Sequence, residues 1–138
     1  MRTDYVEIML QRLSDSEELR GFRLFRADEF RELGYPVSGT IVVIGREEAS
    51  LGCLLGGDSL FGEERLSVIV MTDEKQGGAF CAERARQLCS AMLDCDAEKM
   101  IVSVCVEKCM YDRTAFAYKV IMRFTLREHE QHRQGETA

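Results

Sequence analysis

The 138-residue sequence contains no tryptophan, one proline and two histidines, and its 24 acidic residues outnumber its 18 basic ones. One proline and the lack of low-complexity runs exclude a disordered or fibrous chain. The net charge of −6 argues against a general electrostatic footprint for nucleic acid or anionic membrane. The composition therefore predicts a globular domain with neither a membrane nor sequence-specific nucleic acid as its partner.

Long apolar runs are also missing. No segment approaches the roughly 18 consecutive apolar residues that a membrane-spanning helix needs. The first residues, Met1 to Tyr5, contain no apolar signal core, so we expect no secretion. These absences predict a protein that is neither secreted nor inserted in a membrane.

The six cysteines form no C-x-x-C pair, and their spacings fit neither a zinc site nor a redox motif. A chain of this length can bury a sufficient core without disulfides. We therefore expect free thiols, mostly buried, in a reducing compartment. The cysteines are Cys53, Cys81, Cys89, Cys95, Cys105 and Cys109.

The length and the pattern of apolar residues predict one α+β domain over residues 1–127, followed by a polar tail at 128–138. Helical spacing or alternation marks seven segments in the order α-β-β-β-α-β-β. We expect a mixed or antiparallel sheet with the helices packed on one face. The helices are expected at 3–13 and from Gly77-Gly78 onward, and the strands at 22–27, 40–44, 66–71, 100–106 and 116–126, with a hairpin turn at 111–114.

One short motif is a candidate catalytic site. Gly57-Asp58-Ser59-Leu60 spells the sequence that names a family of serine esterases, but the D-x-x-H pair of that family is absent. A serine without a base to accept its proton is an ordinary alcohol. The only histidines, His129 and His132, lie in the polar tail, where a metal site would lack buried supporting groups. We therefore predict no enzyme activity, no metal and no cofactor.

Apolar residues exceed what a simple two-layer core needs. The strand at 66–71 is apolar on both faces, and the glycine-rich segment 51–62 carries several large apolar side chains. Exposed apolar patches usually mark protein–protein contacts, although the segment at 51–62 can also fold back over the sheet. The candidate interface residues are Leu54, Leu55, Leu60, Phe61, Ile69, Met71, Ile101 and Ile121.

The order of these features resembles a known family. A P-x-x-G turn (Pro36 to Gly39), the stretch Ile44 to Ser50, the Leu60-Phe61-Gly62 connection and a strand that runs into Thr72-Asp73-Glu74 follow the N-terminal helix. A Gly-Gly helix and a C-terminal hairpin with Tyr111-Asp112 complete the pattern. Over most of residues 3–127 the chain resembles the tail terminator, or tail-completion, proteins of long-tailed bacteriophages and prophages.

That resemblance implies a structural protein that is located in the virion tail, or in the bacterial cytoplasm during assembly. Such a subunit forms a ring, expected to be a hexamer, that caps the tail tube and joins it to the head connector. The family contributes no catalytic residues, and the segment 51–62 and the sheet edges become the expected contacts. Two alternatives stay open: a small cytosolic adaptor domain that binds one protein partner, and an esterase or ligand-binding domain with a pocket under the segment 51–62.

Overall fold

Two ten-residue strands form the centre of the sheet in the computed structural model, which describes residues 4–30, 37–47 and 64–127. These strands are β3 (Glu64–Asp73) and β6 (Ala117–Leu126), and they pair antiparallel along their whole length. On the other side of β3 lies β2 (Thr40–Glu47), also antiparallel, and β1 (Phe22–Arg26) runs parallel to β2 at one edge. The sheet is therefore mixed, as one of the two predicted forms.

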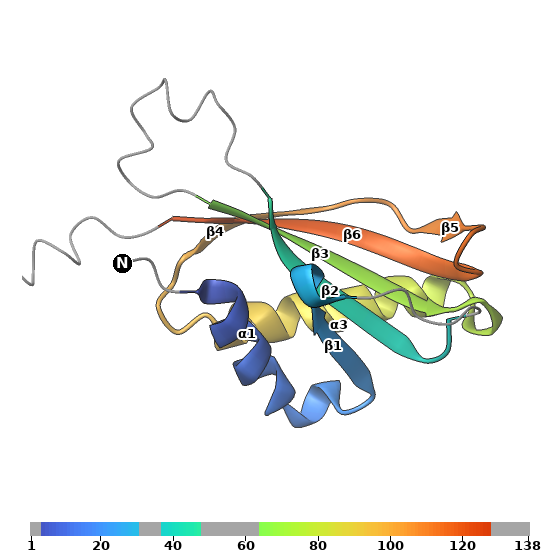
Figure 1. Cartoon of the computed structure of the whole chain (residues 1–138), viewed down its shortest axis with the longest axis horizontal. Helices are drawn as coiled ribbons and strands as arrows, with labels where there is room; N and C mark the ends of the chain where they lie inside the picture. The colour runs from blue at the N-terminus through green and yellow to red at the C-terminus, as the bar shows by residue number, and fades with distance from the viewer. Residues whose placement is uncertain (1–3, 31–36, 48–63, 128–138) are drawn as a thin grey trace, which may run out of the picture.

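The opposite edge of the sheet consists of two short strands. β4 (Ile101–Val106) and β5 (Met110–Asp112) pair with different halves of β6, so the strand order is β1-β2-β3-β6-β4 with β5 beside β6. Figure 1 shows the two edge strands running along β6. Together with two helices this sheet forms an α+β domain, which confirms the predicted fold class.

Alternation along the central strands separates two faces of the sheet. In β3, Leu66, Val68 and Val70 are fully buried, whereas Ile69 and Met71 between them are half-buried. In a strand, successive side chains point to opposite faces, so the two sets belong to different faces. The fully buried set faces the helices and forms the main core.

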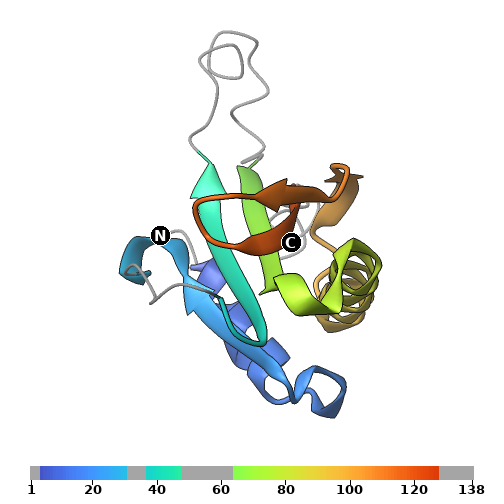
Figure 2. The same cartoon turned by 90° about the vertical axis from the view of Figure 1, so that its right-hand side faces the viewer.

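The helices α1 (Tyr5–Ser14) and α3 (Gly78–Cys95) cover that face, as Figures 1 and 2 show. α1 begins at Asp4, whose side chain accepts a hydrogen bond from the backbone N–H of Glu7 at 3.2 Å, an N-cap that satisfies one free donor of the first turn. Each helix buries one stripe of apolar side chains in the main core. The two stripes are Tyr5, Val6, Met9 and Leu13 of α1, and Cys81, Ala85, Leu88, Ala91 and Met92 of α3.

The second face of the sheet carries a smaller apolar cluster near one end. Val37, Ile41, Val43, Ala115 and Ala117 are buried there. The aromatic side chains of the segment that leaves β1 pack beside them, and the short 3₁₀ helix η2 (Ala27–Glu29) lies against β2. This face is therefore covered in part by the chain itself.

Two details of the C-terminal hairpin differ from the sequence predictions. Residues Met110–Asp112 form the additional strand β5, so the turn comes later than 111–114 and includes Phe116, which has a positive φ of 51°. In β4, a bulge between Ile101 and Ser103 interrupts the alternation. Because a bulge shifts the side-chain phase by one residue, Ile101 shares the helix-covered face with Val104 instead of lying opposite to it.

No helix within the described ranges combines the length and the apolar character that a membrane crossing demands. The predicted tail at 128–138, the segment 51–62 and both histidines lie outside the described residues, so their predictions stand as made.

Candidate assembly interface

The edge formed by β4 and β5 is the most apolar exposed surface of the described structure. In the described residues, these two strands pair only with β6, which leaves their outer backbone groups without a strand partner. Val106 is 54% exposed, Met110 46% and Val102 45%. Of the six large hydrophobic side chains that are exposed in this part of the chain, five lie on the edge or in the turn after it: Val102, Val106, Met110, Tyr111 and Phe116.

A buried carboxylate holds the start of this edge in place. Asp96 follows α3 and is 4% exposed; its oxygens accept hydrogen bonds from the backbone N–H groups of Met100 and Ile101 at 3.0 and 2.8 Å. The hydroxyl of Tyr5 in α1 donates a third, at 3.0 Å. Burial and the neighbouring Asp96 raise the pKa of Tyr5, which therefore stays a neutral donor. The first helix thus fixes where β4 enters the sheet.

A second acidic side chain holds the far end. The Oδ1 atom of Asp112 accepts from the backbone N–H and the hydroxyl of Thr114, at 3.0 and 2.6 Å, and from the backbone N–H of Ala115 at 3.3 Å. Its Oδ2 atom pairs with Lys119 on β6 at 3.3 Å. The hydrogen bonds with Thr114 lower the pKa of Asp112, so it remains ionised. Hydrogen bonds of Asp96 and Asp112 therefore anchor both ends of the edge that carries the exposed apolar side chains.

A groove of about 280 Å³ lies between the edge and α3. Ala85 and Cys89 of the helix form one wall, Val106 and Cys109 form the other, and Val120 of β6 lies among the lining residues. If a strand of a second chain paired with this edge, one of its apolar side chains could pack in this groove.

The sheet face away from the helices contributes a smaller half-buried patch. Ile69 of β3 and Ile121 of β6 are direct cross-strand partners, with Met71 two residues along β3. Beside them Arg123 bridges two carboxylates, pairing with Glu47 at the end of β2 at 3.0 Å and with Glu107 in the connection after β4. This ion-pair row makes one part of the face polar and leaves the isoleucine pair as its apolar centre.

The structure places four of the eight sequence candidates, in two different positions. Ile69, Met71 and Ile121 lie together on the face away from the helices, whereas Ile101 packs against the rim of the main core. Leu54, Leu55, Leu60 and Phe61 lie outside the described residues.

Sequence reasoning did not single out the exposed residues of the edge. Val102, Val106 and Met110 look like ordinary core positions in the sequence, because strand order is needed to show that β4 is an edge. One signal was present: residues 100–106 contain no charged side chain. Edge strands usually carry charges that discourage pairing with another chain, so an uncharged strand is unusual at that position.

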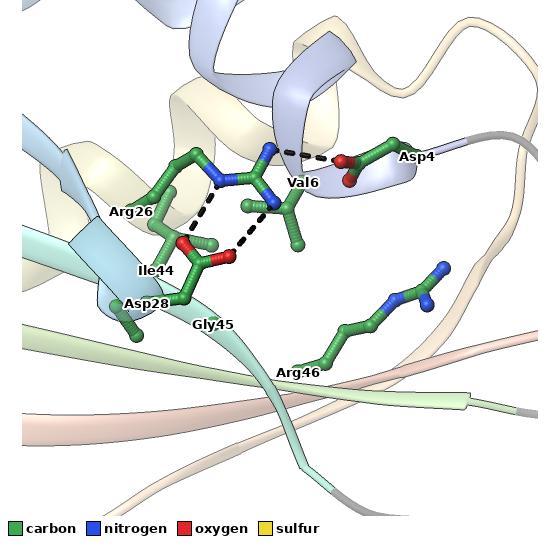
Figure 3. Close-up of a pocket in the computed structure, with 8 residues that line it drawn as sticks. Asp4, Val6, Arg26, Asp28, Ile44, Gly45 and Arg46 are labelled. Atoms are coloured by element: carbon green, nitrogen blue, oxygen red, sulfur yellow. Dashed lines mark hydrogen bonds and ion pairs between the residues drawn. The ribbon is translucent and has the colours of Figure 1, made fainter.

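A separate cleft of about 540 Å³ lies between the start of α1 and the ends of β1 and β2 (Figure 3). Val6 and Ile44 form its apolar part, and Asp4, Arg26 and Asp28 line its polar part. Its size is sufficient for a small ligand. Whether the cleft can bind a polar ligand depends on whether its charged groups already pair with one another.

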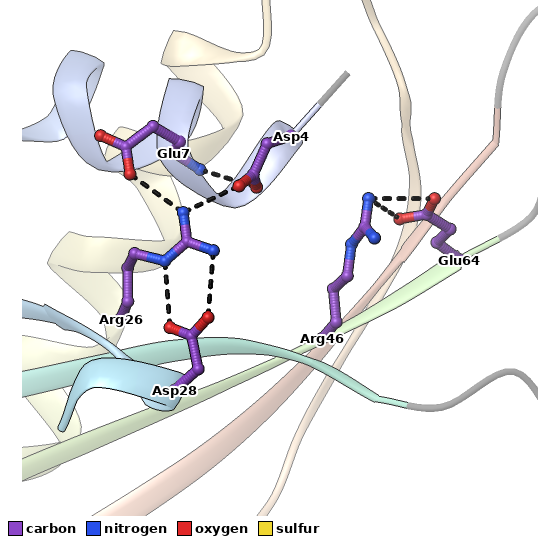
Figure 4. Close-up of polar contacts among 6 residues, drawn as sticks. All are labelled: Asp4, Glu7, Arg26, Asp28, Arg46 and Glu64. Atoms are coloured by element: carbon purple, nitrogen blue, oxygen red, sulfur yellow. Dashed lines mark hydrogen bonds and ion pairs between the residues drawn. The ribbon is translucent and has the colours of Figure 1, made fainter. Parts of the chain in front are cut away.

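Those charged groups pair with one another (Figure 4). The guanidinium of Arg26 donates hydrogen bonds to both carboxylate oxygens of Asp28, at 3.1 and 3.3 Å. Its Nη1 atom also donates to the carboxylates of Asp4, at 2.8 Å, and Glu7, at 2.9 Å. Hydrogen bonds from Arg26 lower the pKa of both Asp4 and Asp28. Arg46 pairs in turn with Glu64 at 3.2 Å. These pairs tie α1 to the sheet and direct the guanidinium of Arg26 toward protein carboxylates.

Within the described ranges, no three potential metal ligands gather in one place. Ser59 of the esterase-like motif lies outside those ranges. The sequence matches no protein-family model, and no curated protein is similar enough to be a relative.

Proposed function

We propose that this chain is a structural assembly subunit that joins copies of itself through the β4–β5 edge, in a ring like those of phage tail terminators. The observation that carries the proposal is the edge formed by β4, which contains no charged side chain, and β5, with Val102, Val106 and Met110 exposed along it. An unpaired strand offers a row of backbone donors and acceptors, and its apolar side chains add burial when a second chain covers them.

The construction of the edge favours a specific contact over random aggregation. The bulge after Ile101 and the break at 107–109 limit the uninterrupted strand to a few residues. Such interruptions restrict which strands can pair with an edge. Anchoring by Asp96 and Asp112 keeps the short strands ordered before association, which lowers the entropy lost on binding.

A ring requires that each copy present two different surfaces that meet head to tail. The sheet has a second edge at β1, on the far side of the sheet from β4, and within the described residues this strand pairs only with β2. We propose that the β4–β5 edge of one copy meets a different surface of the next, with the β1 edge as the candidate. The hexameric ring number, the tail tube and the head connector are proposed from the sequence resemblance.

Sedimentation velocity or light scattering over a range of protein concentrations tests self-assembly. The wild-type chain is expected to form a discrete oligomer as concentration rises. Val106→Lys places a charge on the most exposed apolar position of the edge and is expected to weaken association about tenfold or more. Gln11→Lys adds the same charge at an exposed position of α1 and serves as the matched control.

Native mass spectrometry of mixtures distinguishes a ring from a two-fold dimer. In a head-to-tail ring, a Val106→Lys copy keeps its other surface and should enter mixed oligomers at one end, which prevents closure. In a symmetric edge-to-edge dimer the altered edge is the only contact of such a copy, so it would be depleted from the dimers that form. A wild-type chain that stays monomeric at high concentration, alone and with isolated tail tubes, would overturn the proposed function.

A further inference from the structure

Two cysteine thiols meet beside the break between β4 and β5. Cys109 lies in the connection at 107–109, and its Sγ atom donates to the carbonyl oxygen of Gly78 in the first turn of α3, at 3.5 Å. Cys81 follows three residues later, and its Sγ atom donates to the carbonyl oxygen of Val70 at 3.7 Å. Cys109 is also close enough to Cys81 to contribute to the raised pKa of that thiol. The two thiols therefore lie close together, Cys81 on α3 and Cys109 beside the edge.

The connection at 107–109 packs against the first turn of α3 at Gly78. A Cβ atom at position 78 would be in ordinary van der Waals contact with the sulfur of Cys109, at 3.6 Å, and with ring atoms of Tyr118, at 3.4 Å. Cys81 is fully buried beneath this connection, so the pair is held together by packing on both sides.

We infer that Cys81 and Cys109 are a redox modification site, which forms an intrachain disulfide when the chain meets a low-molecular-weight disulfide such as oxidised glutathione. The Cys109 thiolate attacks one sulfur of that disulfide, forms a mixed disulfide and releases one thiol. The Cys81 thiolate then attacks the Cys109 sulfur and expels the second thiol. The protein gives up two protons and two electrons, and the external disulfide takes them as two thiols.

Access decides which cysteine reacts first. Cys109 lines the groove between α3 and the edge, where a small reagent can enter. Burial raises the pKa of Cys81 to about 11, so its thiol is protonated at neutral pH and a poor nucleophile. Cys81 therefore acts second, once the mixed disulfide lies next to it.

Other pairings are disfavoured by geometry. Cys89 lines the same groove but lies eight residues beyond Cys81 on α3, which is about 12 Å along a helix axis at about 1.5 Å per residue. A disulfide requires Cβ atoms about 4 Å apart. Cys105 pairs in register with Arg123, on the sheet face away from α3. Cys95, the last residue of α3, lies a further six residues along the helix. Among the described cysteines, Cys81 is therefore the one that lies beside Cys109.

The test is exchange of the full chain with oxidised glutathione, followed by alkylation of free thiols and peptide mapping without reduction. The expected result is a chain that is lighter by two hydrogens, with one cross-linked peptide pair that joins Cys81 to Cys109. Dithiothreitol should reverse it. Because the bond is internal to one copy, it is measured in dilute protein and its failure leaves the proposed assembly unaffected.

Two single variants give the controls. Cys89→Ser should form the same bond at an unchanged rate, whereas Cys109→Ser should leave Cys81 fully alkylated after alkylation in denaturant. A wild-type chain in which Cys109 stays as a mixed glutathione disulfide, or in which it cross-links to any other cysteine, would overturn the inference.

Discussion

At the residue scale, a few polar side chains hold the helices and strands in position by hydrogen bonds between them. Asp96 is the clearest example, because its buried carboxylate joins the start of β4 to the hydroxyl of Tyr5 in α1. A buried charge of this kind is tolerated only when its hydrogen bonds are satisfied. Sequence patterns do not show such a contact, since the two residues are 91 positions apart.

Tyr5→Phe should therefore destabilise the chain. The substitution keeps the ring but leaves the Asp96 carboxylate with one donor fewer in a buried site, which costs about 1.5 to 3 kcal/mol. Tyr111→Phe removes a hydroxyl that bonds Glu74 at 2.5 Å on an exposed surface, and should change the free energy of unfolding by about 0.5 kcal/mol or less. Urea unfolding of both variants measures the difference; equal costs would contradict the role given to Asp96.

The lowered pKa of Glu98 predicts that the free energy of unfolding falls in acid. Two hydrogen bonds from Arg12, at 2.7 and 2.8 Å, lower the pKa of Glu98 from 4.5 to about 2. A carboxylate with a depressed folded-state pKa stabilises the fold above its unfolded pKa, and that contribution disappears as pH falls through the folded value. The unfolding free energy should thus decline between pH 4.5 and 2, and Glu98→Gln should reduce the slope there. Parallel curves for the two proteins would exclude Glu98 as the cause.

At the scale of elements, the close approach of η2 to β2 depends on one glycine. A Cβ atom at Gly45 would lie 2.5 Å from the Cβ of Ala27, closer than real side chains approach. The contact closes one end of the second sheet face, beside Phe25 and Phe30, whose rings meet edge to face. The short helix η2 can therefore lie over the second face of the sheet only because residue 45 has no side chain.

Gly45→Ala should cost about 1 to 3 kcal/mol of unfolding free energy, because Ala27 or the β2 backbone must shift. Gly21→Ala is the matched control: a Cβ there meets nothing within 4 Å, so its effect should be close to neutral or slightly stabilising. Thermal unfolding of the two variants provides the comparison. A destabilisation by Gly21→Ala as large as that of Gly45→Ala would contradict the contact.

Most helices and strands of this fold are predictable from the sequence pattern, but some details of β4 and β5 are not. Alternation from Ala117 to Leu126 identifies β6 and its buried face, and the helical stripe that begins at Cys81 identifies α3. The phase of Ile101 was wrong because a bulge in β4 breaks the period of two. β5 was missed because three residues are too few to show a period.

At the scale of the whole molecule, the candidate site follows from topology rather than from composition. An apolar strand such as 100–106 is unremarkable in the centre of a sheet and conspicuous at its edge, and only the strand order distinguishes the two. In the proposed assembly, the net charge of −6 makes copies of the chain repel one another, while the uncharged strand β4 provides a place where two copies can approach. The proposal thereby directs assembly to a defined surface.

The central claim is that copies of this chain meet through the β4–β5 edge, and amide hydrogen exchange at low and high protein concentration tests it most directly. We predict that exchange slows with concentration over residues 101–112, that Val106→Lys abolishes the effect, and that Gln11→Lys retains it. An oligomer in which the amides of 101–112 exchange as fast as in the monomer, while protection appears elsewhere, would contradict the claim.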